Sequence, residues 1–163
     1  MEDFVKKIGV GAFDARLKRM TDAMTYSIRA MYKTLNIDIE PNWYLVLTLI
    51  KNIKSISVVE IAQRMGFAHQ SIDNITKKMI SSGYLIRYKD VKDKRRTIFE
   101  LTNKAEDILP QLENIWNIGE DIFQDIVPNS EVILNQLELI EEELKKSSFG
   151  DRIVAKLNKD KNE

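Results

Sequence analysis

Several residue types are scarce or missing in this sequence of 163 residues, and each absence excludes a class of site. The chain has no cysteine, which rules out disulfide bonds, thiol redox sensing and cysteine-ligated metal. Its single histidine does not supply the histidine cluster of a zinc or catalytic centre. We therefore predict no metal site, no catalytic residues and no cofactor.

Long apolar runs are missing as well. No stretch could span a bilayer and no signal peptide is recognisable, so we expect a cytoplasmic protein with no membrane partner. Only 3 prolines and 6 glycines are present, beside 44% hydrophobic and 31% charged residues. In a chain long enough to bury a core, this composition favours a mainly helical domain.

Charge is balanced overall but unevenly distributed along the chain. The 25 basic residues equal the 25 acidic ones, which argues against a protein that coats nucleic acid everywhere. Residues 69–97 nevertheless contain eight basic and three acidic side chains, whereas residues 113–143 contain nine acidic and no basic ones. Such runs are often only solvated helix faces, but a basic module is also the electrostatic footprint of a phosphate-binding surface.

A helix-turn-helix pattern begins at Ser57. Ser57 and Glu60 have the spacing of a capping box, in which each side chain accepts a hydrogen bond from the other residue's backbone. Gly66 can end this helix in the left-handed conformation. From about 68 to 82, apolar residues fall on one side and polar residues on the other, which predicts a second helix after a short turn.

A basic β-hairpin follows the two helices. Residues 84–89 and 96–101 are rich in strand-forming residues, and the charged loop 90–95 separates them. A helix-turn-helix followed by such a hairpin, the wing, is a winged helix. We therefore predict a mainly α fold, a winged helix-turn-helix with a small hairpin wing and long N- and C-terminal dimerisation helices.

Six residues in and after the wing loop have a characteristic spacing: Asp90, Lys92, Asp93, Arg95, Leu101 and Thr102. This pattern resembles the wing signature of the MarR family of transcriptional regulators, which usually has arginine where Lys92 stands. The segments 61–66, 70–72 and 83–86 are also similar to the family, and the similarity covers roughly residues 42–105. The resemblance implies a dimeric, sequence-specific DNA-binding regulator, a ligand-responsive repressor of a palindromic operator.

Long amphipathic helices are predicted on both sides of the winged helix. Apolar residues recur every three or four positions over 13–35, from Thr102 to about Val127, and again from Ile133 to Leu144. Pro110 should kink the second of these helices. Their combined apolar surface exceeds what one winged helix can cover, which predicts a symmetric homodimer, as the resemblance also implies.

The predicted organisation is one intertwined domain with two functional regions. Residues 1–40 and 103–150 would form the helical dimerisation region, residues 41–102 the winged helix, and residues 151–163 a tail containing a short helix. The first dozen residues read as a lead-in. The helix opened by Pro41 is apolar almost all round, so it should be buried, with Trp43 and Tyr44 in the core.

Double-stranded DNA is the predicted partner, and its contacts fall into three groups. Base edges are within reach of polar residues early in the second helix of the helix-turn-helix, namely His69, Gln70, Ser71 and Asn74. Lysines suit backbone phosphates, namely Lys77, Lys78, Lys92 and Lys94. In the wing, Arg95 and Arg96 would enter the minor groove, and Asp93 would brace the loop or pair with Arg95.

Two positions depart from the MarR pattern. The family commonly has a basic residue where Asn74 stands and serine or threonine where Ala68 would cap the second helix. The first departure alters the expected base preference. The second predicts a weaker start for that helix.

A small apolar or aromatic, anionic effector is expected between the dimerisation helices and the winged helix. Its predicted pocket residues are Met24, Met31, Trp43 and Tyr44, since methionine side chains adapt to varied shapes. Ordinary packing in a core or dimer interface is the competing explanation for these side chains.

Two other function classes compete with DNA binding. A winged helix can serve as a protein-interaction module, with its basic wing against an acidic partner and no specific DNA binding. An enzyme is the second alternative, but the sequence has no glycine-rich phosphate loop, nucleophile elbow or metal-ligand spacing. We therefore predict a protein that is not an enzyme.

Overall fold

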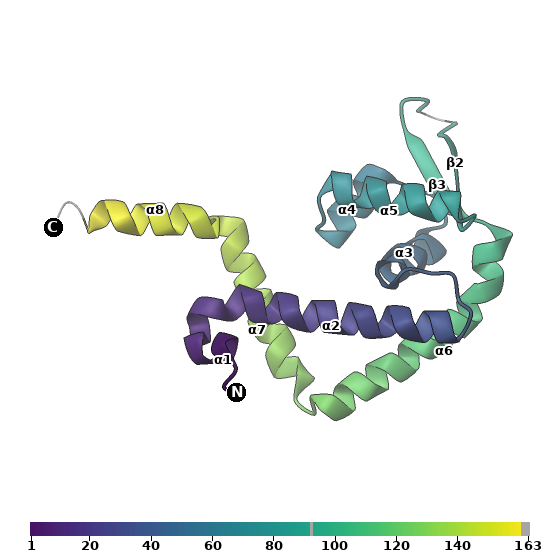
Figure 1. The fold of residues 1–163 in the computed structure, drawn as a ribbon. Helices are drawn as coiled ribbons and strands as arrows, with labels where there is room; N and C mark the ends of the chain where they lie inside the picture. Colours follow the sequence, from purple (N-terminus) through teal and green to yellow (C-terminus); the bar gives the residue numbers. More distant parts are fainter. Residues whose placement is uncertain (92, 161–163) are drawn as a thin grey trace. The chain divides into compact units, whose positions relative to one another are not determined.

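The computed structural model describes residues 1–91 and 93–160, and 74% of the chain is helical (Figure 1). Its contacts form two units, Met1–Pro110 and Gln111–Glu163. The boundary between them falls inside one long helix. The division into dimerisation and winged-helix regions concerns function rather than contacts, and it stays a prediction.

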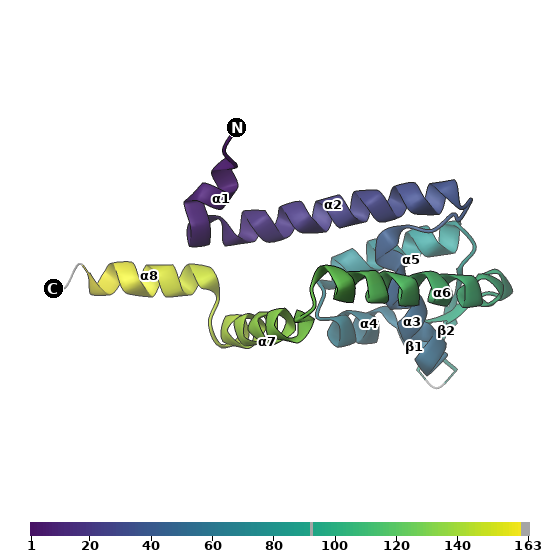
Figure 2. The same ribbon diagram turned by 90° about the horizontal axis from the view of Figure 1, so that it is seen from below.

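The first unit begins with two short helices and one long one. They are α1 (Phe4–Ile8), the 3-10 helix η1 (Gly9–Ala12) and α2 (Phe13–Thr34). Asp3 caps α1 by accepting from the backbone N–H groups of Val5 and Lys6, and its carboxylate also pairs with Arg19 of α2 at 3.0 Å. For α1 and η1 the sequence had indicated only a lead-in, because these two helices are too short to show a periodic pattern. Within this unit, α2 runs past α5 (Figure 2).

After α2 the chain enters the core. Pro41 starts η2 (Pro41–Trp43), which continues as α3 (Tyr44–Ile53), and Val46, Leu47 and Ile50 of α3 are buried. Trp43 is buried as predicted, with its ring edge-to-face against Tyr84 at 5.6 Å between centroids. The prediction that Tyr44 lies in the core is wrong, because 42% of this residue is exposed. An all-apolar helix pattern does not say which side meets solvent.

The helix-turn-helix follows as α4 (Val58–Met65) and α5 (His69–Ser81). The predicted capping box at Ser57 is confirmed, with both hydrogen bonds present. Gly66 ends α4 at φ 66° and ψ 22°, the left-handed conformation that glycine adopts without a steric penalty. The turn is therefore specified by the two residues that the sequence indicated.

A three-stranded antiparallel sheet completes the winged helix. Its strands are β1 (Ile56–Ser57), β2 (Leu85–Lys89) and β3 (Thr97–Leu101), in the order β1-β3-β2. The predicted hairpin is confirmed: β2 and β3 pair from Leu85 opposite Leu101 to Lys89 opposite Thr97. The strand β1 was not predicted, because a two-residue strand carries no alternating pattern. It pairs with β3 only at Ile98 and Phe99.

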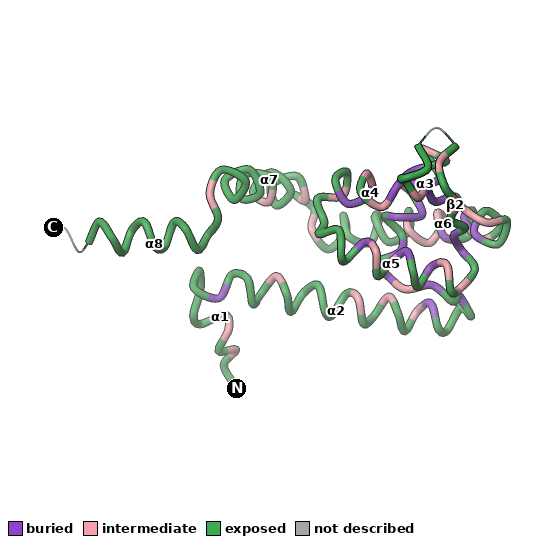
Figure 3. Tube along the Cα trace, turned by 90° about the horizontal axis from the view of Figure 1, so that it is seen from above, coloured by how far each residue is buried: buried purple, intermediate pink, exposed green. Residues whose placement is uncertain are grey.

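Most buried side chains of the first unit gather in the winged helix (Figure 3). They come from η2, α3, α4, α5 and the sheet, with Tyr32, Ile37 and Ile39 from the end of α2 and the segment after it, and Ala105 and Leu109 from the start of α6. Thr76 is the one polar residue of α5 in this core among the described residues, and its hydroxyl donates to the Ile72 carbonyl at 2.9 Å. This hydrogen bond offsets the free-energy cost of burying the Thr76 hydroxyl.

The second unit is entirely helical over its described residues. Helix α6 (Asn103–Ile126) starts in the first unit, where the Thr102 hydroxyl accepts from the Ala105 N–H at 3.2 Å, and α7 (Ser130–Lys146) and α8 (Phe149–Lys159) follow. Arg152 of α8 pairs with Glu143 of α7 at 2.9 Å. Most of the predicted tail is thus the helix α8. No helix in the described part of the chain has the length and apolar content needed to cross a membrane.

Candidate nucleic-acid interface

Helix α5 has one buried face and one exposed face. Ile72, Thr76 and Met79 point into the core, which fixes the rotation of the helix about its axis. The remaining faces carry the predicted DNA contacts on exposed positions, namely His69, Gln70, Ser71, Asn74, Lys77 and Lys78. The structure therefore brings the predicted base-reading and phosphate-binding residues of this helix onto solvent-facing positions.

The start of α5 differs from that of α4. Ala68 occupies the cap position with extended backbone, and it has no side chain that can accept a hydrogen bond. Its carbonyl accepts from the Ser71 and Ile72 N–H groups instead. The absence of a side-chain cap is as the sequence indicated, and the weaker helix start stays a prediction.

One of the two lysines on α5 has an intramolecular partner. Lys77 Nζ lies 2.7 Å from Asp73 Oδ2, one helical turn earlier, with 61% of the lysine side chain exposed. An exposed i,i+4 pair is worth only about 0.3–0.5 kcal/mol, so a phosphate can displace the aspartate readily.

The wing loop is shaped by backbone and carboxylate hydrogen bonds. The Asp93 carbonyl accepts from the Arg96 N–H at 2.9 Å, and Asp93 Oδ1 accepts from the Arg95 N–H at 3.0 Å. The Asp93 side chain thus holds the backbone of Arg95, while the side chains of Lys94 and Arg95 are exposed. Lys92, predicted to bind phosphate, lies outside the described residues.

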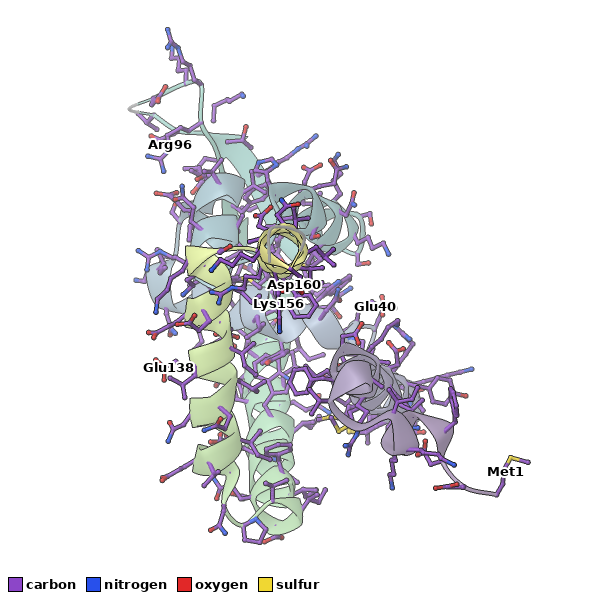
Figure 4. The ribbon with its side chains drawn as sticks, turned by 90° about the vertical axis from the view of Figure 1, so that its left-hand side faces the viewer. Met1, Glu40, Arg96, Glu138, Lys156 and Asp160 are labelled. Atoms are coloured by element: carbon purple, nitrogen blue, oxygen red, sulfur yellow. The ribbon has the colours of Figure 1, made fainter. Side chains whose placement is uncertain are left out.

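Arg96 directly precedes β3, at the loop end of that strand and below the outer end of the loop (Figure 4). Its Nη2 donates to Glu60 Oε2 at 2.6 Å, and its Nη1 lies 4.0 Å from Asp90 Oδ2. The hydrogen bond with Glu60 raises the pKa of the Arg96 guanidinium. Arg95 and Arg96 were both expected at the minor groove, but they occupy different environments: Arg95 is exposed in the loop, whereas Arg96 is paired with Glu60.

Only one of the two roles of Glu60 could be predicted from the sequence. Its role in the capping box was predicted, but its contact with Arg96 was not, because no local pattern links residues 36 positions apart. Hydrogen bonds from Ser57, and then the neighbouring Arg96, lower the pKa of Glu60 to about 2. The carboxylate is therefore charged throughout the range in which the protein would bind DNA.

Two adjoining clefts border the side of α5 that faces α2. They have volumes of about 570 and 420 Å³ and share Arg29, Glu40, Trp43 and Lys78 in their linings. The indole N–H of Trp43 is buried and has no hydrogen-bond partner among the described residues. Of the four predicted pocket residues, Trp43 lines these clefts. Met24 and Tyr44 are exposed and Met31 is half-buried, outside both linings.

Sequence comparison identifies relatives of the winged helix. The sequence profile of the MarR family matches residues 37–96. The HTH-type transcriptional regulator Hpr of Bacillus thuringiensis (strain Al Hakam) is 38% identical over 76 residues, which are 46% of this chain and 40% of that protein. The chain thus matches less than half of the length of these relatives.

Solved structures extend the similarity of the fold. A mutant MarR protein from E. coli in complex with operator DNA has a TM-score of 0.62 and 21% identity, covering 88% of this chain and 99% of that one. The PcaV transcriptional regulator from Streptomyces coelicolor, in complex with its natural ligand, has a TM-score of 0.67 and 16% identity, covering 87% and 98%. The relatives are regulators rather than enzymes. Residues 37–96, the winged helix of this chain, match the MarR family.

Proposed function

We propose that this chain is a transcriptional regulator that binds duplex DNA through α5 and the wing. The observation that carries the proposal is the exposure of polar and basic residues on α5 and at the wing tip, on a frame whose rotation is fixed by the buried face of α5. Exposed basic charge on adjacent elements provides the electrostatic attraction on which DNA binding depends.

Each group of residues has its own task in this scheme. Gln70 and Asn74 can each pair with an adenine edge through two hydrogen bonds, and His69 and Ser71 flank them. Lys77, Lys78, Lys92 and Lys94 would neutralise phosphates, which sets the register of the protein without reading sequence. Arg95, exposed at the wing tip, would enter a narrow A·T-rich minor groove, where the negative potential is strongest.

We also propose that the functional unit is a homodimer. Helices α7 and α8 have no buried residue in the described part of the chain, yet each presents large apolar side chains to solvent. A second copy of this chain is the simplest partner that could cover these apolar side chains, because a symmetric dimer covers them in both copies at once. The two winged helices of such a dimer would then meet a palindromic operator. Residues 1–40 and 103–150 would hold the dimer, with Leu17–Leu35 and Leu112–Leu144 at its interface.

A repressor relieved by a small anionic aromatic effector is the most specific form of the proposal. The MarR protein from E. coli is described with operator DNA and PcaV with its natural ligand, so the fold accommodates both kinds of partner. The clefts beside α5 combine Lys78 and the Trp43 indole with Arg29, whose guanidinium is paired with Glu40 at 2.8 Å and would have to exchange that partner for the effector. An effector acts only if it binds the DNA-competent and DNA-incompetent conformations with different affinities. A cytoplasmic location would give the protein access to its operator.

Selection of binding sites from a random duplex library, followed by a salt titration, tests the DNA-binding proposal. The full-length protein should enrich a palindromic sequence, and the logarithm of its affinity should fall linearly with the logarithm of salt concentration. A scrambled duplex of the same length serves as the control and should bind much more weakly. If neither duplex binds at low salt, the basic module is not a DNA surface and the protein-interaction alternative takes its place.

A further inference from the structure

Among the described residues, one ion pair joins the wing to the helix-turn-helix, and DNA recognition as proposed above makes no use of it. Arg96 Nη2 donates to Glu60 Oε2 at 2.6 Å, which joins the loop end of β3 to the first turn of α4. The strand β1 pairs with β3 only at Ile98 and Phe99. Arg96 lies beyond these two residues, toward the loop, so its ion pair anchors the wing farther out than the sheet does.

The acceptor in this pair is already fixed before Arg96 reaches it. Glu60 Oε2 accepts from the Ser57 backbone N–H at 2.9 Å and from the Ser57 hydroxyl at 2.6 Å. Ion pairs at a surface contribute little when two mobile side chains must both be ordered. Here the capping box has already ordered one partner, so the entropy cost falls on Arg96 alone. The pair can therefore hold a defined geometry although its two side chains are 43% and 41% exposed.

We propose that Arg96 and Glu60 are positioning residues that set the angle between the wing and α5. This inference rests on the DNA binding proposed above. Asn74 on α5 and Arg95 at the wing tip must meet the same duplex in two different grooves. When Asn74 and Arg95 belong to one rigid body, the contact of one residue with DNA holds the other residue close to its own groove. The effective concentration of that second residue at its groove is therefore high. A wing free to swing about its base would lose that advantage with every contact residue still present.

A direct contact between Arg96 and DNA makes the opposite prediction for one substitution. If Arg96 itself bound phosphate or a groove, Glu60 would compete with DNA for its guanidinium. Glu60→Gln would then release the arginine, remove a negative charge and strengthen binding. If Glu60 instead holds Arg96 in place for positioning, the same substitution weakens binding. The sign of the effect separates the two roles.

The test compares Glu60→Gln, Arg96→Gln and the double variant in the full-length chain, on the duplex selected as described above. Glutamine at this position still completes a capping box, so α4 keeps its start and melting curves should show a folded protein. Each single variant should weaken binding by about tenfold, and the double variant should be no weaker than either one. Glu100→Gln on β3 removes a carboxylate outside the pair and should not weaken binding.

A measurement without DNA keeps the inference separate from the proposed function. Because the chain has no cysteine, Gln63→Cys on α4 and Val91→Cys in the wing loop can carry two spin labels at unique positions. The distance distribution between the labels should broaden in Glu60→Gln and in Arg96→Gln. Unchanged distances, or tighter DNA binding by Glu60→Gln, would overturn the inference. If even the unsubstituted protein binds no duplex, the proposed function fails, and the distances still decide whether the pair sets the wing angle.

Discussion

The winged helix buries many of its apolar residues, whereas the helices α7 and α8 leave theirs exposed. In the winged helix, side chains such as Leu47, Ile61 and Met79 are completely buried within the same chain. In α7 and α8 the apolar side chains, Ile140 and Phe149 among them, remain accessible over the described residues. The first region can be stable by its own packing. The second has the pattern of a surface that becomes a core only when another molecule covers it.

This difference assigns different tasks to the two regions. A module that completes its own core can present α5 and the wing in a fixed arrangement whether or not a partner is present. Helices without buried residues gain most of their stability from packing against something else, because isolated helices of this length are marginal in water. Substitutions in the two regions should therefore differ in what they destabilise and in whether protein concentration matters.

The largest effect is expected from Leu47→Ala in α3. Leu47 is fully buried, so the substitution leaves a cavity and should lower the free energy of unfolding by about 2–5 kcal/mol. The matched control, Leu134→Ala on α7, removes the same atoms from a position that is exposed in the single chain. At protein concentrations low enough to keep the chain monomeric, it should cost about 0.5 kcal/mol or less. Urea denaturation measures both. Equal losses of unfolding free energy in the two variants would mean that α7 shares a core with the winged helix, which contradicts the difference between the two regions.

The next largest effect concerns association. Ile140→Lys places a charge on the apolar face of α7 and should raise the dissociation constant of the dimer by at least about 30-fold. Asn135→Lys adds the same charge on the opposite side of the helix and serves as the control. Sedimentation equilibrium over a range of concentrations distinguishes them, and the melting temperature of the unsubstituted dimer should rise with concentration. A monomer at every concentration would contradict the dimer proposal.

DNA recognition should change without any change in association. Asn74→Ala should cost about 1–3 kcal/mol per half-site on the selected duplex and little on a scrambled one, because a base contact is lost. Lys77→Ala should weaken binding to both and reduce the salt dependence by about one counterion per subunit. Equilibrium binding on the two duplexes over a salt series tests the pair. Identical effects on both duplexes would remove Asn74 from the base-reading set.

The sequence was informative wherever a few neighbouring residues determine the backbone. The capping box at Ser57, the left-handed end at Gly66 and the basic hairpin are local features, and each is confirmed. Periodic apolar residues similarly predicted α2 and α6 to within a residue or two of their ends. These features depend on contacts that are short in sequence, which is why a pattern can reveal them.

Contacts between distant segments were not predictable in the same way. The strand β1 is too short to have a pattern, and the pairing of Glu60 with Arg96 joins residues that look like a helix cap and a loop charge. Tyr44 appeared to belong to the core because its helix is apolar all round, and only the packing of α3 shows which side stays exposed. The roles of individual side chains in DNA binding remain predictions.

The smallest expected effect is the pH dependence contributed by Glu60. Its folded-state pKa of about 2 lies below the ordinary value of 4.5, so the ionised carboxylate stabilises the fold above pH 4.5, and this stabilisation disappears as the pH falls from 4.5 toward 2. Because 41% of the side chain is exposed, solvent screening limits the contribution to about 1 kcal/mol or less. The unfolding free energy of Glu60→Gln should therefore lie below that of the unsubstituted chain at pH 6 and converge with it near pH 2.

Two further variants show which contacts produce that convergence. Hydrogen bonds from Ser57 are the larger cause of the depressed pKa and Arg96 the smaller, so Arg96→Gln should retain most of the pH dependence while loosening the wing. In the second unit, Lys146 and then Arg152 lower the pKa of Glu143, whose side chain is 53% exposed. Glu143→Gln should consequently change the acid profile less than Glu60→Gln does. A gap between Glu60→Gln and the unsubstituted chain that stays constant from pH 6 to pH 2 would show that Glu60 stabilises α4 by shape rather than by charge.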